Sequence, residues 1–171
     1  MAHKSPLVAV DTNVLLDLAA ENDDCWDCLE ALKRRRQLPR FVVMPTVLQE
    51  LAHLTDNGKS KAVRALAMIA LQSLLSWGFE PLDLQPVGHG IVERIGDEIR
   101  SKGLLPEEER NDSYIIAEAA LCECDVLVSS DTEITGVDQV SLQALLQGFH
   151  VKPVAILWPR QVVRVLGRTP V

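Results

Sequence analysis

The sequence contains few aromatic residues and no long apolar run. Aromatic residues make up 4% of the 171 residues, so the interior of the folded chain must rest mainly on Leu, Val, Ile and Ala. The longest uninterrupted apolar run is Ala65 to Leu71, which is far too short to span a bilayer. The run before Asp11, from Leu7 to Val10, is too short for the apolar part of a signal peptide. We therefore expect a cytoplasmic protein with no membrane segment.

Cysteine is scarce, and its spacing matches no zinc pattern. Cys25 and Cys28 form a C-x-x-C pair, whereas Cys122 and Cys124 form C-x-C, so a zinc site would need both pairs to converge. A redox pair at Cys25 and Cys28 is an alternative, but both residues lie inside a stretch with helical periodicity. We expect reduced and mostly buried thiols, which is the common state of free cysteine.

The sequence also lacks an excess of basic residues, since its formal net charge is −7. An acidic protein is at first sight a poor nucleic-acid binder, because contacts to phosphate need Lys and Arg. The objection weakens if several acidic side chains are neutralised by metal ions. The densest basic run contains Arg34, Arg35 and Arg36. These residues either hold an RNA backbone or form a solvated helix end, where cations suit the helix dipole.

Short apolar runs alternate along the chain with stretches of helical periodicity. The expected strands are 7–10, 41–44, a short strand within 79–87, 125–128 and 154–157. The expected helices are 14–20, 23–36, 47–55, 60–77, 91–99, 112–122, 140–147 and a last helix that starts at Pro159. This alternation predicts an α/β fold of three layers, with a mostly parallel sheet flanked by helices. No linker, repeat or low-complexity segment is found, so residues 1–171 are expected to form a single domain.

Two of the expected helices have features with further consequences. Thr46 and Gln49 have the spacing of a capping box, which leaves the neighbouring Glu50 without a structural role. His53 follows Glu50 as an E-x-x-H pair, but a di-iron site needs two such pairs, so a surface histidine is expected. The 60–77 helix is apolar enough to serve as a homodimer interface.

Four acidic residues lie where strands end or where the adjoining helices begin. Asp11 follows the first expected strand directly, and Asp131 follows the 125–128 strand after two serines. Glu50 lies on the helix after the second strand, and Asp112 begins the helix that leads into the 125–128 strand. Ligands of open parallel sheets bind beyond the carboxyl ends of the strands. We therefore expect these four side chains to converge on one edge.

Each of these acids also has a purely structural explanation. Asp11 and Asp112 could be helix N-caps, Asp131 a turn residue and Glu50 a solvated helix residue. As a set they are more specific, because two carboxylates 4 Å apart repel by about 4 kcal/mol at an effective dielectric of 20. Oxygen-rich clusters of this kind suit hard cations, so Mg²⁺ or Mn²⁺ is the expected cofactor.

Five segments of the sequence resemble the PIN-domain family of metal-dependent ribonucleases, in the order in which they occur there. The segments are VAVDTNV at 8–14, MPTVLQEL at 44–51, NDSYIIAEA at 111–119, VLVSSDTE at 126–133 and ILWPRQV at 156–162. Each segment alone is a weak signal, but the ordered set spans almost the whole chain. The longer stretch between Thr132 and Lys152, with its expected helix, departs from the usual family pattern.

The resemblance implies both an activity and a set of site residues. Asp11, Glu50, Asp112 and Asp131 occupy the four acidic positions of the family's active site. Supporting roles are expected for Thr12, Asn13, Ser130 and Glu133. The implied activity is hydrolysis of single-stranded or structured RNA by an endoribonuclease that uses Mg²⁺ or Mn²⁺. Many family members are toxins, so an antitoxin-like protein is an expected partner beside the RNA substrate.

Two other classes of function stay open. A phosphatase with an aspartyl nucleophile also has Asp after its first strand, but it would need a second Asp at the position of Asn13. A PIN-like module that binds RNA or a partner without catalysis is the more serious alternative. The four intact acids argue against it.

Overall fold

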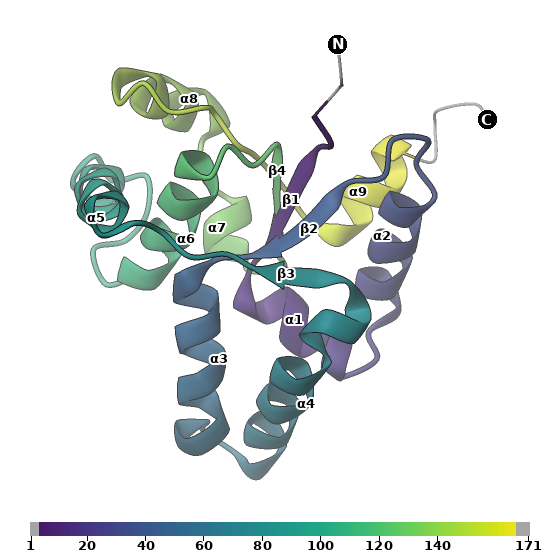
Figure 1. The fold of residues 1–171 in the computed structure, drawn as a ribbon. Helices are drawn as coiled ribbons and strands as arrows, with labels where there is room; N and C mark the ends of the chain where they lie inside the picture. Colours follow the sequence, from purple (N-terminus) through teal and green to yellow (C-terminus); the bar gives the residue numbers. More distant parts are fainter. Residues whose placement is uncertain (1–3, 167–171) are drawn as a thin grey trace.

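The centre of the protein is a five-stranded sheet whose strand pairings are all parallel (Figure 1). The computed structural model describes residues 4–166. The strands are β1 (Leu7–Val10), β2 (Arg40–Val43), β3 (Phe79–Pro81), β4 (Val126–Val128) and β5 (Ala155–Leu157), in the spatial order β3-β2-β1-β4-β5. The chain therefore leaves the central strand β1 toward one edge of the sheet and later returns to build the other.

The central strands are continuous apolar runs because helices cover both faces of the sheet. All four residues of β1 are buried, as expected for a parallel strand with no solvent-facing side. In the register, Val10 is opposite Val43 on one side and Val128 on the other. The carboxyl ends of these strands are therefore level, and the residues that follow them meet at one edge.

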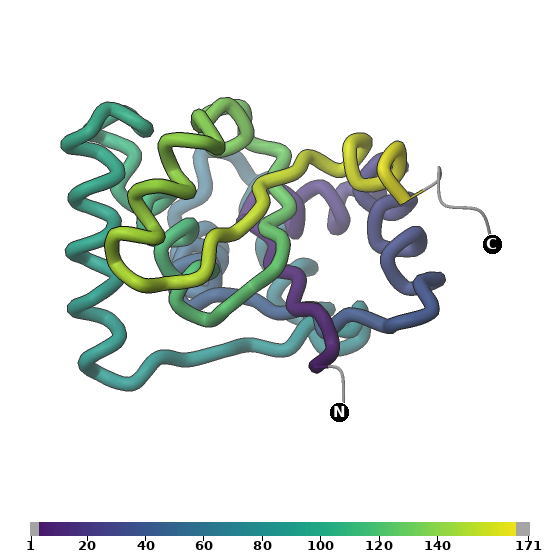
Figure 2. Tube along the Cα trace, turned by 90° about the horizontal axis from the view of Figure 1, so that it is seen from above, coloured from purple at the N-terminus to yellow at the C-terminus, as the bar shows by residue number. Residues whose placement is uncertain are grey.

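The helices form layers on either side of the sheet. They are α1 (Thr12–Ala19), α2 (Asp23–Lys33), α3 (Pro45–Asn57), α4 (Lys61–Trp77), α5 (Pro86–Ser101), α6 (Arg110–Leu121), α7 (Thr132–Thr135), α8 (Gln139–Gly148) and α9 (Pro159–Leu166). In both views α2 and α9 pack side by side on one face, whereas α5, α6 and α8 lie on the other (Figures 1 and 2). The expected three-layer α/β fold is confirmed.

The expected elements are confirmed in type and order, and three local details differ. The short helix α7 was not expected, because four residues carry no readable periodicity. The capping box is wrong: Met44 is the N-cap of α3, and the Thr46 hydroxyl bonds to a different helix. Asp112 as an N-cap is also wrong, because α6 begins two residues earlier at Arg110.

Two further observations concern the length of the apolar helices and the state of the cysteines. Within residues 4–166, no helix has both the length and the apolar character needed to cross a bilayer. The four cysteines are free thiols, and Cys25, Cys28 and Cys124 are buried. Burial raises the pKa of each of these three thiols to about 12, so they stay protonated and unreactive at neutral pH.

The close contact between α5 and α6 depends on Gly96. A Cβ atom at this position would lie 2.6 Å from Cδ1 of Tyr114 on α6, which is closer than real atoms approach. On the same helix, a Cβ atom at Gly90 would meet nothing within 4 Å. Gly96 therefore sets the distance between the two helices, whereas Gly90 does not.

We predict that Gly96→Ala destabilises the fold and that Gly90→Ala does not. Overpacking against the Tyr114 ring should cost about 1–3 kcal/mol of unfolding free energy. Gly90→Ala should instead raise the unfolding free energy by about 0.5–1 kcal/mol, because glycine is destabilising within a helix. Urea denaturation of the two variants checks both signs, and a Gly96→Ala variant as stable as Gly90→Ala would contradict this account of the contact.

Candidate metal centre

A cavity of about 570 Å³ lies at the carboxyl edge of the sheet. It is lined by Asp11, Thr12, Asn13, Thr46, Gln49, Glu50, His53, Leu54, Glu109, Asn111, Asp112, Ile115 and Asp131. All four acids expected at the site therefore line one cavity, although α3 and α6 supply two of them from distant parts of the sequence. The cavity sits beside β1 and β4, where the chain direction across the sheet reverses and ligands of such sheets bind.

Asp11 joins the end of β1 to the start of α1. Its Oδ1 accepts the backbone N–H of Val14 at 2.8 Å, so the expected N-cap is present. Its Oδ2 accepts a hydrogen bond from the Ser129 hydroxyl. The side chain is almost fully buried, and this burial raises the pKa of Asp11 to about 7. Asp11 therefore serves both as a cap and as an acid of the cavity.

Ser129 connects Asp11 to Asp131. Its Oγ donates to Asp11 and accepts the backbone N–H of Asp131 at 3.0 Å. Asp131 in turn caps α7 through Glu133 N–H at 2.7 Å and accepts Asn13 Nδ2 at 3.0 Å. Ser130 is the serine expected from the sequence to support the site, but Ser129 is the one that bonds to both aspartates. Along an extended chain successive side chains point to opposite sides, so Ser129 and Asp131 share a side. This alternation is a signal in the sequence that favours Ser129.

Two of the expected supporting residues are directed elsewhere. The Ser130 hydroxyl donates to Oδ2 of Asp17 on α1 at 2.8 Å. Glu133 is exposed and is absent from the cavity lining, although its backbone N–H donates to the Asp131 carboxylate, which caps α7. The structure therefore brings Thr12 and Asn13 to the cavity and leaves Ser130 and Glu133 outside it.

Glu50 is held by two donors across the cavity. The Thr12 hydroxyl on α1 donates to its Oε2, and Asn111 Nδ2 on α6 donates to its Oε1 at 2.9 Å. Asn111 was not selected from the sequence. The feature of the sequence that points to Asn111 is its position directly before Asp112. Glu50 thus connects three helices while keeping its carboxylate at the cavity wall.

Asp112 lies in the first turn of α6, where Glu109 adds a fifth carboxylate to the cavity. The pKa of Asp112 is raised to about 8, first by partial burial and then by the charges of Asp131, Glu109 and Glu50. Glu109 is a further site residue that the sequence analysis missed. Without a cation, the cavity therefore retains protons near neutral pH.

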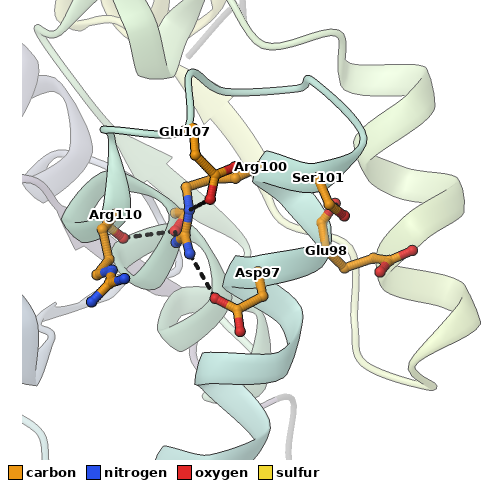
Figure 3. Close-up of polar contacts among 7 residues, drawn as sticks. Asp97, Glu98, Arg100, Ser101, Glu107 and Arg110 are labelled. Carbon is orange, nitrogen blue, oxygen red and sulfur yellow. Dashed lines mark hydrogen bonds and ion pairs between the residues drawn. The ribbon is translucent and has the colours of Figure 1, made fainter.

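The first turn of α6 is positioned by a buried arginine on α5 (Figure 3). Arg100 Nη1 donates to Ser113 Oγ at 2.6 Å, and this hydroxyl donates to the first carbonyl of α6 at 2.6 Å. Nη2 bonds to Asp97 at 2.6 Å, and Nε lies 3.8 Å from Glu107 without a hydrogen bond. This network ties the turn that carries Asp112 to the neighbouring helix.

A buried glutamate holds α3 against α6. Glu118 on α6 accepts the Thr46 backbone N–H at 3.2 Å and the Thr46 hydroxyl at 2.7 Å. Its carboxylate therefore lies at the N-terminus of α3, where the helix dipole favours an anion. Burial nevertheless raises the pKa of Glu118 to about 7. The contact fixes the distance between the helices that carry Glu50 and Asp112.

The basic run lies apart from the cavity. Arg34, Arg35 and Arg36 follow the end of α2 and precede β2, so they lie near the amino edge of the sheet, opposite the acids. Arg34 pairs with Glu30 at 3.0 Å within its own helix. None of the three lines the cavity. Their expected contact with RNA stays a prediction that concerns another part of the surface.

The chemistry of the cavity fits a hard divalent cation. Five carboxylates line it, and no Lys or Arg does. Within residues 4–166, no three Asp, Glu, His or Cys side chains lie close enough together to surround an ion as they stand. Mg²⁺ is usually held by one or two carboxylates together with waters and substrate phosphates. Asp11 and Asp131, joined through Ser129, supply such a pair.

Comparison with solved structures identifies the fold. No protein-family model matches the sequence, and no curated protein matches it. The chain is similar to a chain in the crystal structure of VapBC2 from Rickettsia felis bound to a DNA fragment from the VapBC2 promoter. The two chains have 17% sequence identity and a TM-score of 0.60, and the match covers 89% of this chain and 98% of that one. It is also similar to VapBC-5 of the VapBC toxin-antitoxin family from Mycobacterium tuberculosis, with 22% identity, a TM-score of 0.52 and the same two coverages.

Both of these solved structures are of VapBC proteins, and the matched chains have a PIN-like α/β fold. The protein therefore has the PIN-like α/β fold that the sequence resemblance predicts. At such identities the likeness establishes the fold, and the function has to be argued from the cavity.

We predict that the stability of the metal-free protein falls as the pH rises. A carboxyl group with a raised pKa binds its proton more tightly in the folded chain than in the unfolded one. Its stabilising effect is complete below the ordinary value near 4 and is lost through about 7 for Asp11 and about 8 for Asp112. In EDTA, the melting temperature should therefore fall between about pH 5 and pH 8.

Asp112→Asn should flatten this decline, because asparagine cannot take up the charge. The matched control is Asp56→Asn, an exposed position on α3 that is not part of the cavity lining. Thermal unfolding at several pH values compares the slopes. A wild-type slope in Asp112→Asn would contradict the assignment of the raised pKa to this residue.

Proposed function

We propose that the protein is a metal-dependent endoribonuclease, acting as the toxin component of a toxin–antitoxin pair. The observation that carries the proposal is the convergence of Asp11, Glu50, Asp112 and Asp131 on one cavity at the carboxyl edge of a PIN-like sheet. The fold shared with the matched VapBC chains supports the same class of function. Single-stranded or structured RNA is the proposed substrate, and the cytoplasm is the proposed location.

The cavity residues divide into those that would hold the cation and those that would position water. Asp11 and Asp131 would hold Mg²⁺ or Mn²⁺, with Asp112 completing the site once it loses its proton. The bound cation supplies a more acidic water and offsets negative charge that develops on the phosphate. Glu50 is oriented from both sides by Thr12 and Asn111, so it suits the role of a fixed acceptor for a water proton.

Hydrolysis here would need no covalent intermediate on the protein. No cysteine is among the cavity residues, and the hydroxyls of Thr12 and Thr46 already donate to carboxylates. Water is therefore the proposed nucleophile. A phosphatase with an aspartyl nucleophile is disfavoured, because Asn13 occupies the position of its second Asp and donates to Asp131 instead.

We propose that the chain binds two kinds of protein partner. The first is an antitoxin-like protein, because the VapBC systems share this fold. A second copy of the chain is the other, with α4 as the proposed contact. Met68, Ile69 and Leu75 of α4 are 43%, 44% and 77% exposed, so this helix presents an apolar surface of the kind that a partner covers.

We predict that the purified protein cleaves single-stranded RNA with Mn²⁺ or Mg²⁺ and that EDTA stops it. Asp112→Asn and Asp131→Asn should each lower kcat/KM at least about 100-fold, which corresponds to about 2.7 kcal/mol of transition-state stabilisation. The metal-free variants should be as stable as the wild type or more so, because asparagine cannot add a charge to the crowded carboxylates at any pH. Asp56→Asn serves as the control that retains activity.

The same experiment separates the enzyme from a non-catalytic binding module. Mn²⁺ should raise the melting temperature of the wild type by binding linkage, and that of the two variants less. RNA binding without cleavage in either metal would favour the binding module. Cleavage that persists in excess chelator would remove the metal mechanism altogether.

We predict that charge reversal at Arg34, Arg35 and Arg36 affects long RNA and spares short RNA. These residues lie away from the cavity, so an oligonucleotide that fills only the cavity should be cleaved at the wild-type rate. A long RNA should bind more weakly, with a flatter dependence of affinity on salt. Binding titrations across salt concentrations measure this slope, and an unchanged slope would assign the three arginines to the solvated surface.

A further inference from the structure

Some of the side-chain hydrogen-bond donors that line the cavity already bond to carboxylates, and others do not. Four lining side chains already donate to carboxylates: Thr12 and Asn111 to Glu50, Asn13 to Asp131, and Thr46 to Glu118. Of the remaining lining residues, Gln49 and His53 carry side-chain donors that make no such bond within residues 4–166. Both are exposed residues of α3, and their spacing of four places them on one face of the helix.

His53 and Asn57 lie one turn apart on α3 and are in contact. Asn57 Nδ2 donates to the His53 backbone carbonyl at 3.2 Å and lies 3.3 Å from Nδ1 of the ring. The contact therefore involves Nδ1, whereas Nε2 of the ring has no side-chain partner among residues 4–166.

The spacing of Glu50 and His53 suggests a pair of metal ligands. Within residues 4–166, however, no three Asp, Glu, His or Cys side chains lie close enough together to surround an ion. What His53 offers the cavity is a ring N–H group, which can donate a hydrogen bond.

An acidic cavity that accepts a nucleic-acid strand needs donors of this kind. Five carboxylates line it and no Lys or Arg does, so its own charge opposes a polyanion. A cation would offset this charge at the acids, but the phosphates on either side of the scissile bond need further partners. Gln49 and His53 lie on the α3 wall, where their side-chain N–H groups can bind a phosphate beside the acids that would hold the cation.

We propose that Gln49 and His53 form a phosphate-binding edge that holds a phosphodiester next to the scissile one. The inference rests on the proposed ribonuclease function and specifies how its substrate strand is held. Nε2 of His53 and the Gln49 amide donate to the non-bridging oxygens of one phosphate. The substrate strand therefore runs along α3, and the acids of β1, β4 and α6 act on the adjacent linkage.

The test compares His53→Phe and Gln49→Met, which keep side-chain size and remove the donors. Each should raise KM for a short RNA about tenfold, as expected for one hydrogen bond to a charged group, with kcat changed less than twofold. Calorimetry should show Mn²⁺ affinity equal to that of the wild type. The control is His150→Phe, an exposed histidine beyond α8 that is not part of the cavity lining.

A methylphosphonate scan then locates the contact. Replacing one charged linkage at a time with a neutral one should raise KM for the wild type at a position beside the cleavage site. The double variant His53→Phe, Gln49→Met should be insensitive at that same position, because its partner for that phosphate is gone. Equal sensitivity in the wild type and the double variant would overturn the proposal.

Other outcomes are equally decisive. Weaker Mn²⁺ binding by His53→Phe would make His53 a metal ligand and refute the edge. An unchanged KM in both single variants would also refute the phosphate-binding edge, but it would not contradict the proposed ribonuclease function. If the wild type cleaves no RNA, the proposed function fails by itself. Fluorescence anisotropy of the same oligonucleotide then still tests the edge, because both variants should bind it about tenfold more weakly.

Discussion

Repulsion among carboxylates at the ends of β1 and β4 is the constraint on which the rest of the site depends. Five acids line one cavity, and their negative charges are accommodated in different ways. Asp11 has a helix N-terminus and the Ser129 hydroxyl, and Glu50 has two donors from two other helices. Asp112 has no such donor among residues 4–166, and its pKa rises to about 8, so in the metal-free protein it keeps a proton. The carboxylates of the cavity therefore suit a cation, and the retained proton lowers their mutual repulsion without one.

The helices around the cavity are held by buried polar contacts that have no catalytic role of their own. Glu118 connects α6 to the first turn of α3, and Arg100 connects α5 to the first turn of α6. Gly96 allows the second of these contacts by removing the side chain that would meet Tyr114. Buried charges are costly unless they are paired and hydrogen-bonded. Glu118 and Arg100 are paired in this way, and they set the positions of the helices that carry Glu50 and Asp112.

The proposed metal-binding carboxylates and the proposed phosphate donors differ in their positions on the cavity wall. The side formed by β1, β4 and α6 carries four of the five carboxylates, whereas α3 carries Glu50 together with the proposed phosphate donors Gln49 and His53. In the proposed enzyme, such donors would receive a polyanion without a basic patch beside the carboxylates. The basic run near Arg35 lies toward the other edge of the sheet, so contacts with a longer nucleic acid would be spatially separate from catalysis.

Much of the fold and the outline of the site can be read from the sequence. Alternating apolar runs and helical periodicity indicate a parallel α/β sheet, because a strand buried on both faces must be apolar throughout, as β1 is. Asp11 and Asp131 are recognisable because residues that follow parallel strands meet at one edge, and Glu50 and Asp112 because they lie on the helices that adjoin β2 and β4. Neither conclusion requires knowledge of individual side-chain contacts.

Only the tertiary structure decides which polar groups serve these acids. Ser129 rather than Ser130 bonds to Asp11, and the partner of Thr46 is Glu118, which lies 72 residues away in the sequence. Glu109 and Asn111 reach the cavity because α6 begins before Asp112. A hydrogen bond depends on distances of a few tenths of an ångström between separate elements. Local sequence patterns determine the elements, but packing between the elements sets those distances.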